Sequence, residues 1–269
     1  MSRLADKTAI VLGAAGAGNM GQVIAKAFSE EGAKVVVAGR NEAELDKIAA
    51  QIGGSAVRCD ITDHSDLQRL ADGVVSSHGK VDVAVNAVGW GLSSSLLEIE
   101  DADLRKMVDI QFIGTHYFLS EIVRVMKDND PQGGSIIQIS SATTQALINN
   151  YAAYIGTKTG SDALIRCVAN DFGQYGIKAN SISPALTKTP MTEGSFGLPG
   201  LVDAFLPRYP LGRLNTSEDI AKTAIWLASD DAYITGQNIQ ANGGLTLRGN
   251  PQAAEVGASI AAATASAPN

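Results

Sequence analysis

The chain has 269 residues, of which 45% are hydrophobic, and its formal net charge is −7 at pH 7. This balance excludes the basic footprint of a nucleic-acid-binding protein and gives no electrostatic attraction to an anionic membrane surface. No apolar stretch reaches the roughly 18 residues that a membrane span needs. The N-terminal residues lack the basic start and the cleavage site of a secretory signal, so we expect a cytoplasmic protein. The three histidines show no ligand spacing, and we predict no metal site.

Apolar runs of strand length alternate with helical patterns along most of the chain. Strands are expected at residues 8–13, 34–39, 55–62, 81–89, 133–141, 177–184 and 238–244. Helices are expected at residues 21–33, 42–54, 64–79, 101–128, 151–176 and 217–230. Strand–helix alternation with short connections predicts βαβ units and a parallel sheet covered on both faces. The expected fold class is therefore α/β, a doubly wound parallel sheet in a single domain over residues 1–248.

Two segments depart from this alternation. Residues 185–212 carry Gly, Pro, Thr and scattered aromatic residues, and we interpret them as a mobile, variable substrate loop with short helices. Residues 249–269 are rich in Ala, Ser, Gly and Pro, with few large apolar side chains to offset the entropy of ordering. This composition favours a disordered C-terminal tail. A short alanine-rich helix lying on a neighbouring subunit is the alternative.

A glycine-rich turn, GAAGAGNMG at residues 13–21, lies between the first expected strand and the first expected helix. Glycines at this place allow a tight turn and let the backbone approach a pyrophosphate. The helix N-terminus behind them offers free N–H groups and a positive dipole end. Strand, glycines and helix in this order therefore indicate a dinucleotide site.

The end of the second expected strand carries the signal for the type of dinucleotide. An acid at this place holds the ribose hydroxyls in many such folds, and an arginine nearby accepts a 2′-phosphate. Here the acid is missing, and Arg40 lies between Gly39 and Asn41. A guanidinium suits a phosphate in charge and in fork geometry, so we favour NADP(H) over NAD(H). A solvated surface arginine is the alternative interpretation.

A set of motifs in fixed order resembles the short-chain dehydrogenase/reductase family over residues 4–248. Besides the glycine turn, the motifs are CDIT at 59–62, NAVG at 86–89, SIIQISS at 135–141, Tyr154-x-x-x-Lys158, PALTKT at 184–189 and ITGQNIQANGG at 234–244. The resemblance implies a Rossmann-type catalytic domain that transfers a hydride between a nicotinamide and a carbonyl or alcohol. It also implies a homotetramer or, less often, a dimer. Helices 101–128 and 151–176 would pack across one two-fold axis, and residues 217–248 across another.

The resemblance also assigns cofactor contacts. Asp60 and Ile61 would flank the adenine, residues 86–89 would line the cofactor, and residues 184–189 would hold the nicotinamide amide. The full set expected to bind the cofactor is Gly13, Ala15, Asn19, Met20, Arg40, Asn41, Asp60, Ile61, Asn86, Ala87, Val88, Gly89, Ile139, Tyr154, Lys158, Pro184, Ala185, Leu186, Thr187 and Thr189.

Three places in the chain depart from the family pattern. With Gly21 aligned to the last glycine of the usual G-x-x-x-G-x-G, the turn is two residues longer, and Asn19 replaces the middle glycine. This longer turn is similar to that of the enoyl-thioester reductase branch. NAVG replaces the usual NNAG, and Gln111 stands where a catalytic Asn is common.

Tyr154 and Lys158 are predicted to form the acid/base pair of the site. A free tyrosine has a pKa of about 10, too high for a good base at neutral pH, and a cation one helical turn away lowers that pKa. The lysine would also bond the nicotinamide ribose. By the resemblance, Ser141 holds the substrate oxygen, and Gln111 anchors a water relay behind Lys158 that its longer side chain would shift.

Tyr151 is the competing phenol. It lies seven residues before Lys158, which is the spacing of the enoyl-reductase branch. A phenol about 10 Å from the lysine along the helix axis suits a thioester carbonyl held over the nicotinamide. Ser141 and the one-turn spacing of Tyr154 favour carbonyl or alcohol chemistry instead. Enoyl reduction through Tyr151 and an NADP-binding protein without turnover remain as alternatives.

Apolar residues are expected to border the substrate site. They favour a bulky apolar ketone or secondary alcohol, such as a cyclic, terpenoid, aromatic or steroid-like compound, and a 3-oxoacyl thioester is the next choice. Trp90, Tyr151 and Phe196 are the main candidates for substrate contact. The other apolar candidates are Leu92, Ala146, Leu147, Ile148, Met191, Leu198, Phe205 and Leu206.

Overall fold

Seven parallel strands form one sheet in the order β3-β2-β1-β4-β5-β6-β7. The computed structural model of the chain describes residues 2–266. The strands, from β1 to β7, are Thr8–Leu12, Lys34–Gly39, Ser55–Arg58, Val83–Asn86, Gly134–Ile139, Ile177–Ile182 and Asn238–Ile239. The strand order reverses between β1 and β4, which pair in parallel from Ala9↔Val83 to Leu12↔Asn86. In open parallel sheets such a reversal leaves a crevice at the carboxyl ends of the strands.

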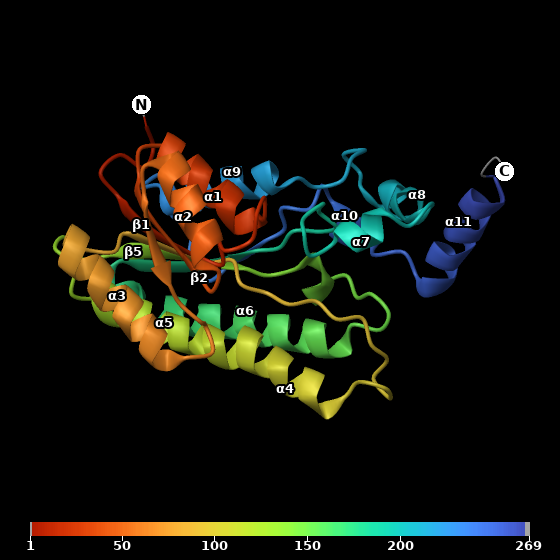
Figure 1. Cartoon of the computed structure of the whole chain (residues 1–269), viewed down its shortest axis with the longest axis horizontal. Helices are drawn as coiled ribbons and strands as arrows, with labels where there is room; N and C mark the ends of the chain where they lie inside the picture. The colour runs from red at the N-terminus through yellow and green to blue at the C-terminus, as the bar shows by residue number, and fades with distance from the viewer. Residues whose placement is uncertain (1, 267–269) are drawn as a thin grey trace.

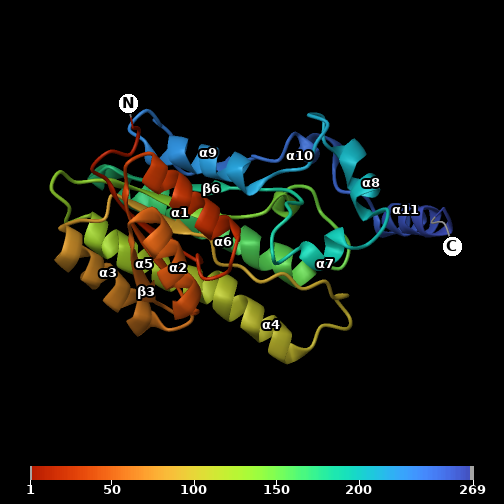
Figure 2. The same ribbon diagram turned by 45° about the horizontal axis from the view of Figure 1, so that its top comes forward.

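Helices cover both faces of the sheet (Figure 1). One face packs against α1 (Met20–Glu30), α2 (Glu42–Ile52) and α9 (Ser217–Ala228). The other face packs against α3 (His64–His78), α5 (Gly114–Met126) and α6 (Ala152–Phe172). In the turned view, α9 lies along the upper edge and α3 at the lower left (Figure 2). The predicted doubly wound α/β fold is confirmed.

The core follows from the alternation of side chains along strands that are buried on both faces. In β1, Ile10 and Leu12 join the cluster under α3, α5 and α6, whereas Ala9 and Val11 join the cluster under α1, α2 and α9. Successive strand residues point to opposite faces, so a strand covered on both sides must be apolar throughout. This is why the central strands appear in the sequence as short unbroken apolar runs.

The long helix expected at 101–128 is interrupted. α4 (Asp101–Val108) passes into a π-helical turn, Asp109–Ile113, before α5 begins at Gly114. A Cβ at Gly114 would lie 2.7 Å from the carbonyl oxygen of Ile61, so glycine lets this helix lie close to the chain after β3. A single π turn inside a helix often marks a functional position, and here it carries Gln111.

The 185–212 segment contains short helices, as predicted. They are α7 (Glu193–Phe196), α8 (Leu201–Phe205) and a 3-10 turn at Leu206–Arg208. After α10 (Leu245–Arg248), the C-terminal segment forms α11 (Ala253–Ala265). The expectation of a disordered tail is therefore wrong for these residues, and α11 packs against α8 of the same chain. Within residues 2–266, no helix has the length and apolar character that crossing a membrane requires.

Candidate functional site

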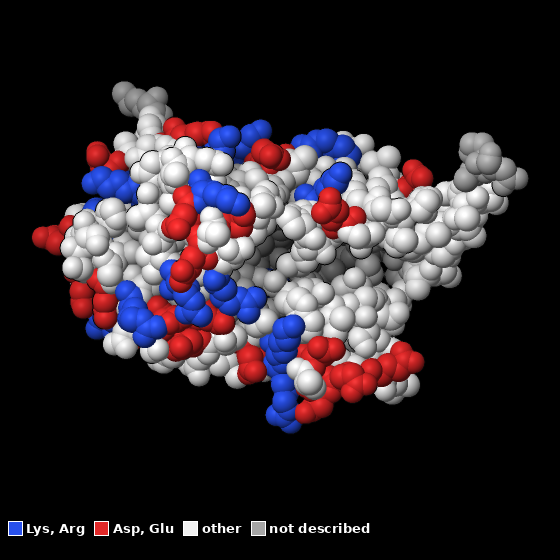
Figure 3. Space-filling view, viewed as in Figure 1, with Lys and Arg blue, Asp and Glu red and all other residues white. Residues whose placement is uncertain are grey.

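A cleft runs along the carboxyl ends of the central strands. Its volume is about 980 Å³. It begins at the glycine turn after β1, passes the ends of β2, β4, β5 and β6, and continues between the 185–212 segment and α11. Figure 3 shows the hollow between the charged body of the protein and the nearly uncharged C-terminal helix.

The glycine turn holds one end of the cleft in a tight shape. Gly13 has φ 98°, and a Cβ there would lie 2.7 Å from the backbone carbon of Ala87. Asn19 caps α1: its side-chain oxygen accepts from the Gln22 N–H at 2.9 Å, and its amide donates to the Gly13 carbonyl at 2.8 Å. The extra residues of the turn thus tie the start of α1 to the end of β1, and Asn19 does so through its side chain.

The lining of the cleft fits a dinucleotide. The glycine turn and the N-terminus of α1 line the cleft together with the ends of β2 and β3. A helix N-terminus with a glycine turn suits a pyrophosphate, and the neighbouring strand ends suit the adenosine half. Predicted cofactor contacts that line the cleft are Gly13, Ala15, Asn19, Met20, Arg40, Asn41, Asp60, Ile61, Ala87, Val88, Gly89, Ile139, Tyr154, Lys158, Pro184, Ala185, Leu186, Thr187 and Thr189.

Arg40 stands at the rim of the adenosine end. Its side chain is 70% exposed, and its guanidinium lies 3.9 Å from the carboxylate of Asp60. Hydrogen bonds from Thr62 and the charges of Arg40 and Arg58 outweigh burial and lower the pKa of Asp60. At that distance and exposure the pair is weak, so the Arg40 side chain is free to turn toward an anion in the cleft.

Lys158 is a buried cation at the centre of the cleft. It is 3% exposed, and its Nζ donates to the carbonyl oxygen of Ile139 at 2.8 Å. A Cβ at Gly89 would lie 3.4 Å from this Nζ, so the glycine leaves room for the ammonium. Burial lowers the pKa of Lys158 to about 8, and the carboxylate of Asp162 acts in the opposite direction.

Asp162 lies one helical turn beyond Lys158 and was not singled out by the sequence patterns. Its carboxylate accepts from the hydroxyl of Ser140 at 2.8 Å and from the amide of Asn238 at 2.6 Å. Burial raises the pKa of this carboxyl, whereas its hydrogen bonds and Lys158 act to lower it. The residue connects α6 to the ends of β5 and β7.

Tyr154 and Ser141 line the cleft beside Lys158. Burial raises the pKa of the Tyr154 phenol, and a hydrogen bond with the Ser141 side chain acts in the opposite direction. The pKa of Tyr154 is thus raised in the protein without cofactor, because burial outweighs the hydrogen bond with Ser141, and the predicted lowering is not found there. The phenol is protonated at neutral pH. Tyr151 also lines the cleft, with its ring edge-on to that of Tyr154 at 6.0 Å between centroids.

Gln111 and Asn86 lie behind the cleft wall and do not line it. Gln111 is 2% exposed; its amide donates to the Thr157 hydroxyl at 2.8 Å, and its side-chain oxygen accepts from the Trp90 N–H at 3.3 Å. That oxygen would lie 3.5 Å from a Cβ at Gly89, close to the space that Lys158 occupies. Asn86 is 1% exposed and accepts from the Val88 N–H at 3.0 Å, so it supports the turn after β4.

The apolar candidates divide into two groups. Trp90, Ile148, Met191 and Phe205 line the cleft as expected. Phe196 does not, because the short α7 helix presents Ser195 to the cleft instead. The remaining candidates also lie outside the lining: Leu92, Ala146, Leu147, Leu198 and Leu206.

The C-terminal helix supplies lining residues that the sequence patterns missed. Ala253, Val256, Gly257 and Ile260 border the cleft, preceded by Asn250 and Pro251. These residues are spaced by three and four positions, as residues on one helix face are. This spacing was the sequence signal that could have identified them as lining residues. Composition alone, dominated by Ala, Ser and Gly, concealed it.

Fold and cleft together define a dinucleotide-binding protein of the doubly wound α/β class. A sequence model of the family described as "Enoyl-(Acyl carrier protein) reductase" matches residues 13–246. The chain belongs to the short-chain dehydrogenase/reductase family of oxidoreductases.

Two curated relatives are similar over nearly the whole chain. "Borneol dehydrogenase, mitochondrial" of Lavandula x intermedia is 32% identical over 254 residues, which cover 92% of this chain and 93% of that protein. "(-)-isopiperitenol/(-)-carveol dehydrogenase, mitochondrial" of Mentha piperita is 33% identical over 256 residues, covering 91% and 95%.

Solved structures show the same fold. A short-chain type dehydrogenase/reductase from Mycobacterium ulcerans has a TM-score of 0.87 at 29% identity, covering 92% of each chain. A gluconate 5-dehydrogenase from Burkholderia cenocepacia, in complex with NADP and tartrate, has a TM-score of 0.86 at 25% identity, covering 91% and 97%. A 3-ketoacyl-(acyl-carrier-protein) reductase from Brucella melitensis, complexed with NADH, has a TM-score of 0.82 at 26% identity, covering 90% and 99%.

Because the ammonium of Lys158 is buried, we expect the free energy of unfolding to depend on pH. Its pKa is about 8 in the folded chain and has the ordinary value of 10.5 in the unfolded chain, so between these values the unfolded state binds more protons. The contribution of Lys158 to the free energy of unfolding therefore rises with pH in this window, by on the order of 3 kcal/mol at most. Urea unfolding of the cofactor-free protein and of Lys158→Met should show a difference that moves in favour of the wild type from pH 8 to 10.5.

Lys26→Met, on the exposed side of α1, is the matched control and should follow the wild-type curve. Other groups that titrate in this range cancel in the difference between wild type and variant. A difference that stays constant over the window would contradict the lowered pKa.

Proposed function

We propose that this oxidoreductase is NADP(H)-dependent and acts on bulky apolar ketones or secondary alcohols, with Tyr154 as the acid/base. The observation that carries the proposal is that Ser141, Tyr154 and Lys158 line one cleft together with the glycine turn. A proton donor, a hydroxyl partner and a cation next to a dinucleotide site are the groups that carbonyl reduction needs.

The protonation states favour a role in donating a proton to a carbonyl oxygen. Hydride transfer is the chemistry that a bound nicotinamide supplies. A phenol whose pKa is raised by burial keeps its proton at neutral pH, so Tyr154 is ready to give that proton to a substrate oxygen. Ser141 would hold the same oxygen through its hydroxyl. Lys158 would bond the cofactor ribose and stabilise the phenolate that remains.

We assign Gln111 a positioning role within the same proposal. Its amide holds Thr157, the neighbour of Lys158 on α6, and its oxygen holds the backbone at Trp90. It therefore connects the helix that carries the catalytic pair to the loop that borders the substrate region. From the family resemblance, the proposal also gives Gln111 a water held behind Lys158.

The proposed substrate class rests on the residues that line the outer cleft, which is the part of the cleft between the 185–212 segment and α11. Trp90, Ile148, Met191 and Phe205 give one side an apolar surface, and α11 gives the other side Val256 and Ile260. Clefts of this kind bind apolar molecules and use a few polar groups for orientation. Borneol and carveol, named in two of the relatives, are cyclic alcohols of this class.

NADP(H) is proposed over NAD(H) because Arg40 is the cation at the adenosine rim and the second strand ends without an acid. Related structures hold NADP in one case and NADH in another, so the preference depends on this chain's own residues.

The second candidate function is enoyl-thioester reduction through Tyr151. It is favoured by the long glycine turn, by the position of Tyr151 on the cleft and by the description of the matching family. A 3-oxoacyl thioester would instead use Tyr154 and extend along the same outer cleft.

We also propose a homotetramer and a cytoplasmic location, both from the family resemblance and the composition. Apolar side chains are exposed in both regions expected to meet a partner. In the region of helices 101–128 and 151–176, Leu104 and Phe112 are each 38% exposed. In the region 217–248, Trp226, Tyr233 and Leu247 are exposed.

Tyr154→Phe tests the acid/base assignment. We expect kcat for the reduction of a cyclic ketone such as camphor with NADPH to fall by about 10³-fold, because a proton donor is removed. The dissociation constant of NADPH, measured by fluorescence, should stay within about twofold of wild type.

The matched control for this test is Tyr151→Phe, which removes the neighbouring hydroxyl and should lower kcat by less than about tenfold. The reverse pattern, with crotonyl thioesters reduced at the C=C bond, would establish the enoyl-type arrangement instead. Wild-type protein that binds NADPH but turns over neither ketones nor thioesters would favour a non-catalytic role.

Arg40→Gln tests the cofactor preference. Removing the guanidinium should raise KM for NADPH by about 10-fold to 100-fold while leaving KM for NADH nearly unchanged, because a charge-assisted bond to a phosphate is lost. Arg58→Gln is the control, since Arg58 lies nearby on β3 but does not line the cleft. A wild-type enzyme that prefers NADH would overturn the assignment.

Analytical ultracentrifugation tests the assembly. A tetramer of about four chain masses is expected at micromolar concentration, because the exposed apolar surface in two separate regions supports two kinds of two-fold contact. Trp226→Glu should weaken one contact and give dimers. A wild-type chain that sediments as a monomer refutes the proposal.

A further inference from the structure

The first two turns of the C-terminal helix contact both sides of the outer part of the cleft, between the 185–212 segment and the loop before α6. On one side, the backbone N–H of Ala253 donates to the side-chain oxygen of Asn149 at 2.9 Å, and the buried Asn250 donates to the Ala146 carbonyl. Both partners belong to the loop between β5 and α6. The start of α11 is therefore fixed to the segment that leads into the helix carrying Tyr154.

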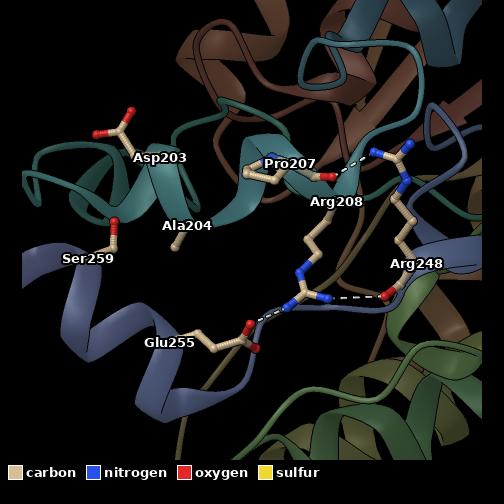
Figure 4. Close-up of a pocket in the computed structure, with 7 residues that line it drawn as sticks. All are labelled: Asp203, Ala204, Pro207, Arg208, Arg248, Glu255 and Ser259. Atoms are coloured by element: carbon tan, nitrogen blue, oxygen red, sulfur yellow. Dashed lines mark hydrogen bonds and ion pairs between the residues drawn. The ribbon is translucent and has the colours of Figure 1, made fainter.

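On the other side of the cleft, the 185–212 segment with its short helices holds α11. The hydroxyl of Ser259 donates to the carbonyl of Gly200 at 2.7 Å, and Arg208 forms an ion pair with Glu255. Figure 4 shows Arg208 reaching across to Glu255 and to the carbonyl of Arg248, which it meets at 3.2 Å. The helix thus touches both sides of the cleft.

One face of α11 points into the cleft, and the opposite face points to solvent. Ala253, Val256, Gly257 and Ile260 line the cleft, and Val256 packs against the cluster that contains Phe205. Ala258 lies away from the cleft lining and is exposed. The face directed inward carries no charge.

We propose that α11 forms the outer wall of the substrate site and that Gly257 sets the size of the ring system that fits there. Gly257 is exposed but lines the cleft, and a Cβ built on it meets no atom within 4 Å, so side-chain atoms added there have open space at this wall. Glycine in a helix interior costs about 1 kcal/mol relative to alanine, and here it leaves room between Val256 and Ile260 on the cleft wall. This inference rests on the proposed ketone reduction and adds the element that selects for substrate bulk.

A graded series at Gly257 tests the proposal. Gly257→Ala and Gly257→Leu fill the space progressively and raise the helix propensity of an exposed helix. With camphor and NADPH, KM should rise by about twofold for the alanine variant and by about tenfold or more for the leucine variant. With cyclopentanone, which is a single small ring, KM should stay within about twofold of wild type for both variants.

Ala258→Leu is the matched control, because it adds the same side chain to the opposite face. It should leave both KM values at the wild-type level, and NADPH binding should be unchanged in all three variants. Equal behaviour of Gly257→Leu and Ala258→Leu toward camphor, in a protein that reduces camphor, overturns the role of α11 and leaves the proposed function standing. A wild-type protein that reduces neither ketone overturns both.

Discussion

The site depends on a cation buried at the carboxyl end of the central strands. Lys158 is 3% exposed, and removing an ammonium from water costs several kcal/mol unless partners replace the hydration. The partners here are the Ile139 carbonyl at 2.8 Å and the carboxylate of Asp162 one helical turn away. Ile139 lies at the end of β5 and Asp162 lies on α6. The buried cation is therefore stabilised only when α6 packs against the end of β5.

This requirement extends through a polar network across the sheet. Asp162 is bonded to Ser140 and Asn238, and the side-chain oxygen of Asn238 accepts from the Ser183 hydroxyl at 2.6 Å. The strand ends of β5, β6 and β7 are thereby tied to the same helix turn as the cation. Both of the bonds to Asp162 go to its Oδ2, whereas its buried Oδ1 has no hydrogen-bond partner among the described residues. The network therefore ties α6 to the strands through one carboxylate oxygen and leaves the other unsatisfied, which costs stability in a buried site.

Those parts of the molecule that packing and periodicity determine could be predicted from the sequence. The unbroken apolar run of β1 identifies a strand buried on both faces, and the glycines after it identify the cofactor turn. The positions of Tyr154 and Lys158 follow from helix geometry once α6 is recognised. The pKa of Tyr154 could not be predicted in the same way, because it depends on how deeply the phenol is buried. Spacing contains no information on burial, and burial outweighs the hydrogen bond with Ser141.

The parts that escaped prediction are stabilised by contacts between distant segments. The π turn at Gln111 preserves helical spacing on both sides, so nothing in the apolar pattern marks it. Phe196 is apolar, as the residues that line such a cleft often are, but it lies on a one-turn helix that orients it away from the cleft. α11 has no fully buried residue among those described, and bonds such as Ser259 to Gly200 hold it instead of a core. Elements held in this way unfold locally at a low cost in free energy. Their sequences can also change without disturbing the fold. In the proposed function, a rigid interior would hold the reacting groups, and a lightly held outer wall would let the accepted substrate size change through a single position such as Gly257 while the chemistry stays the same.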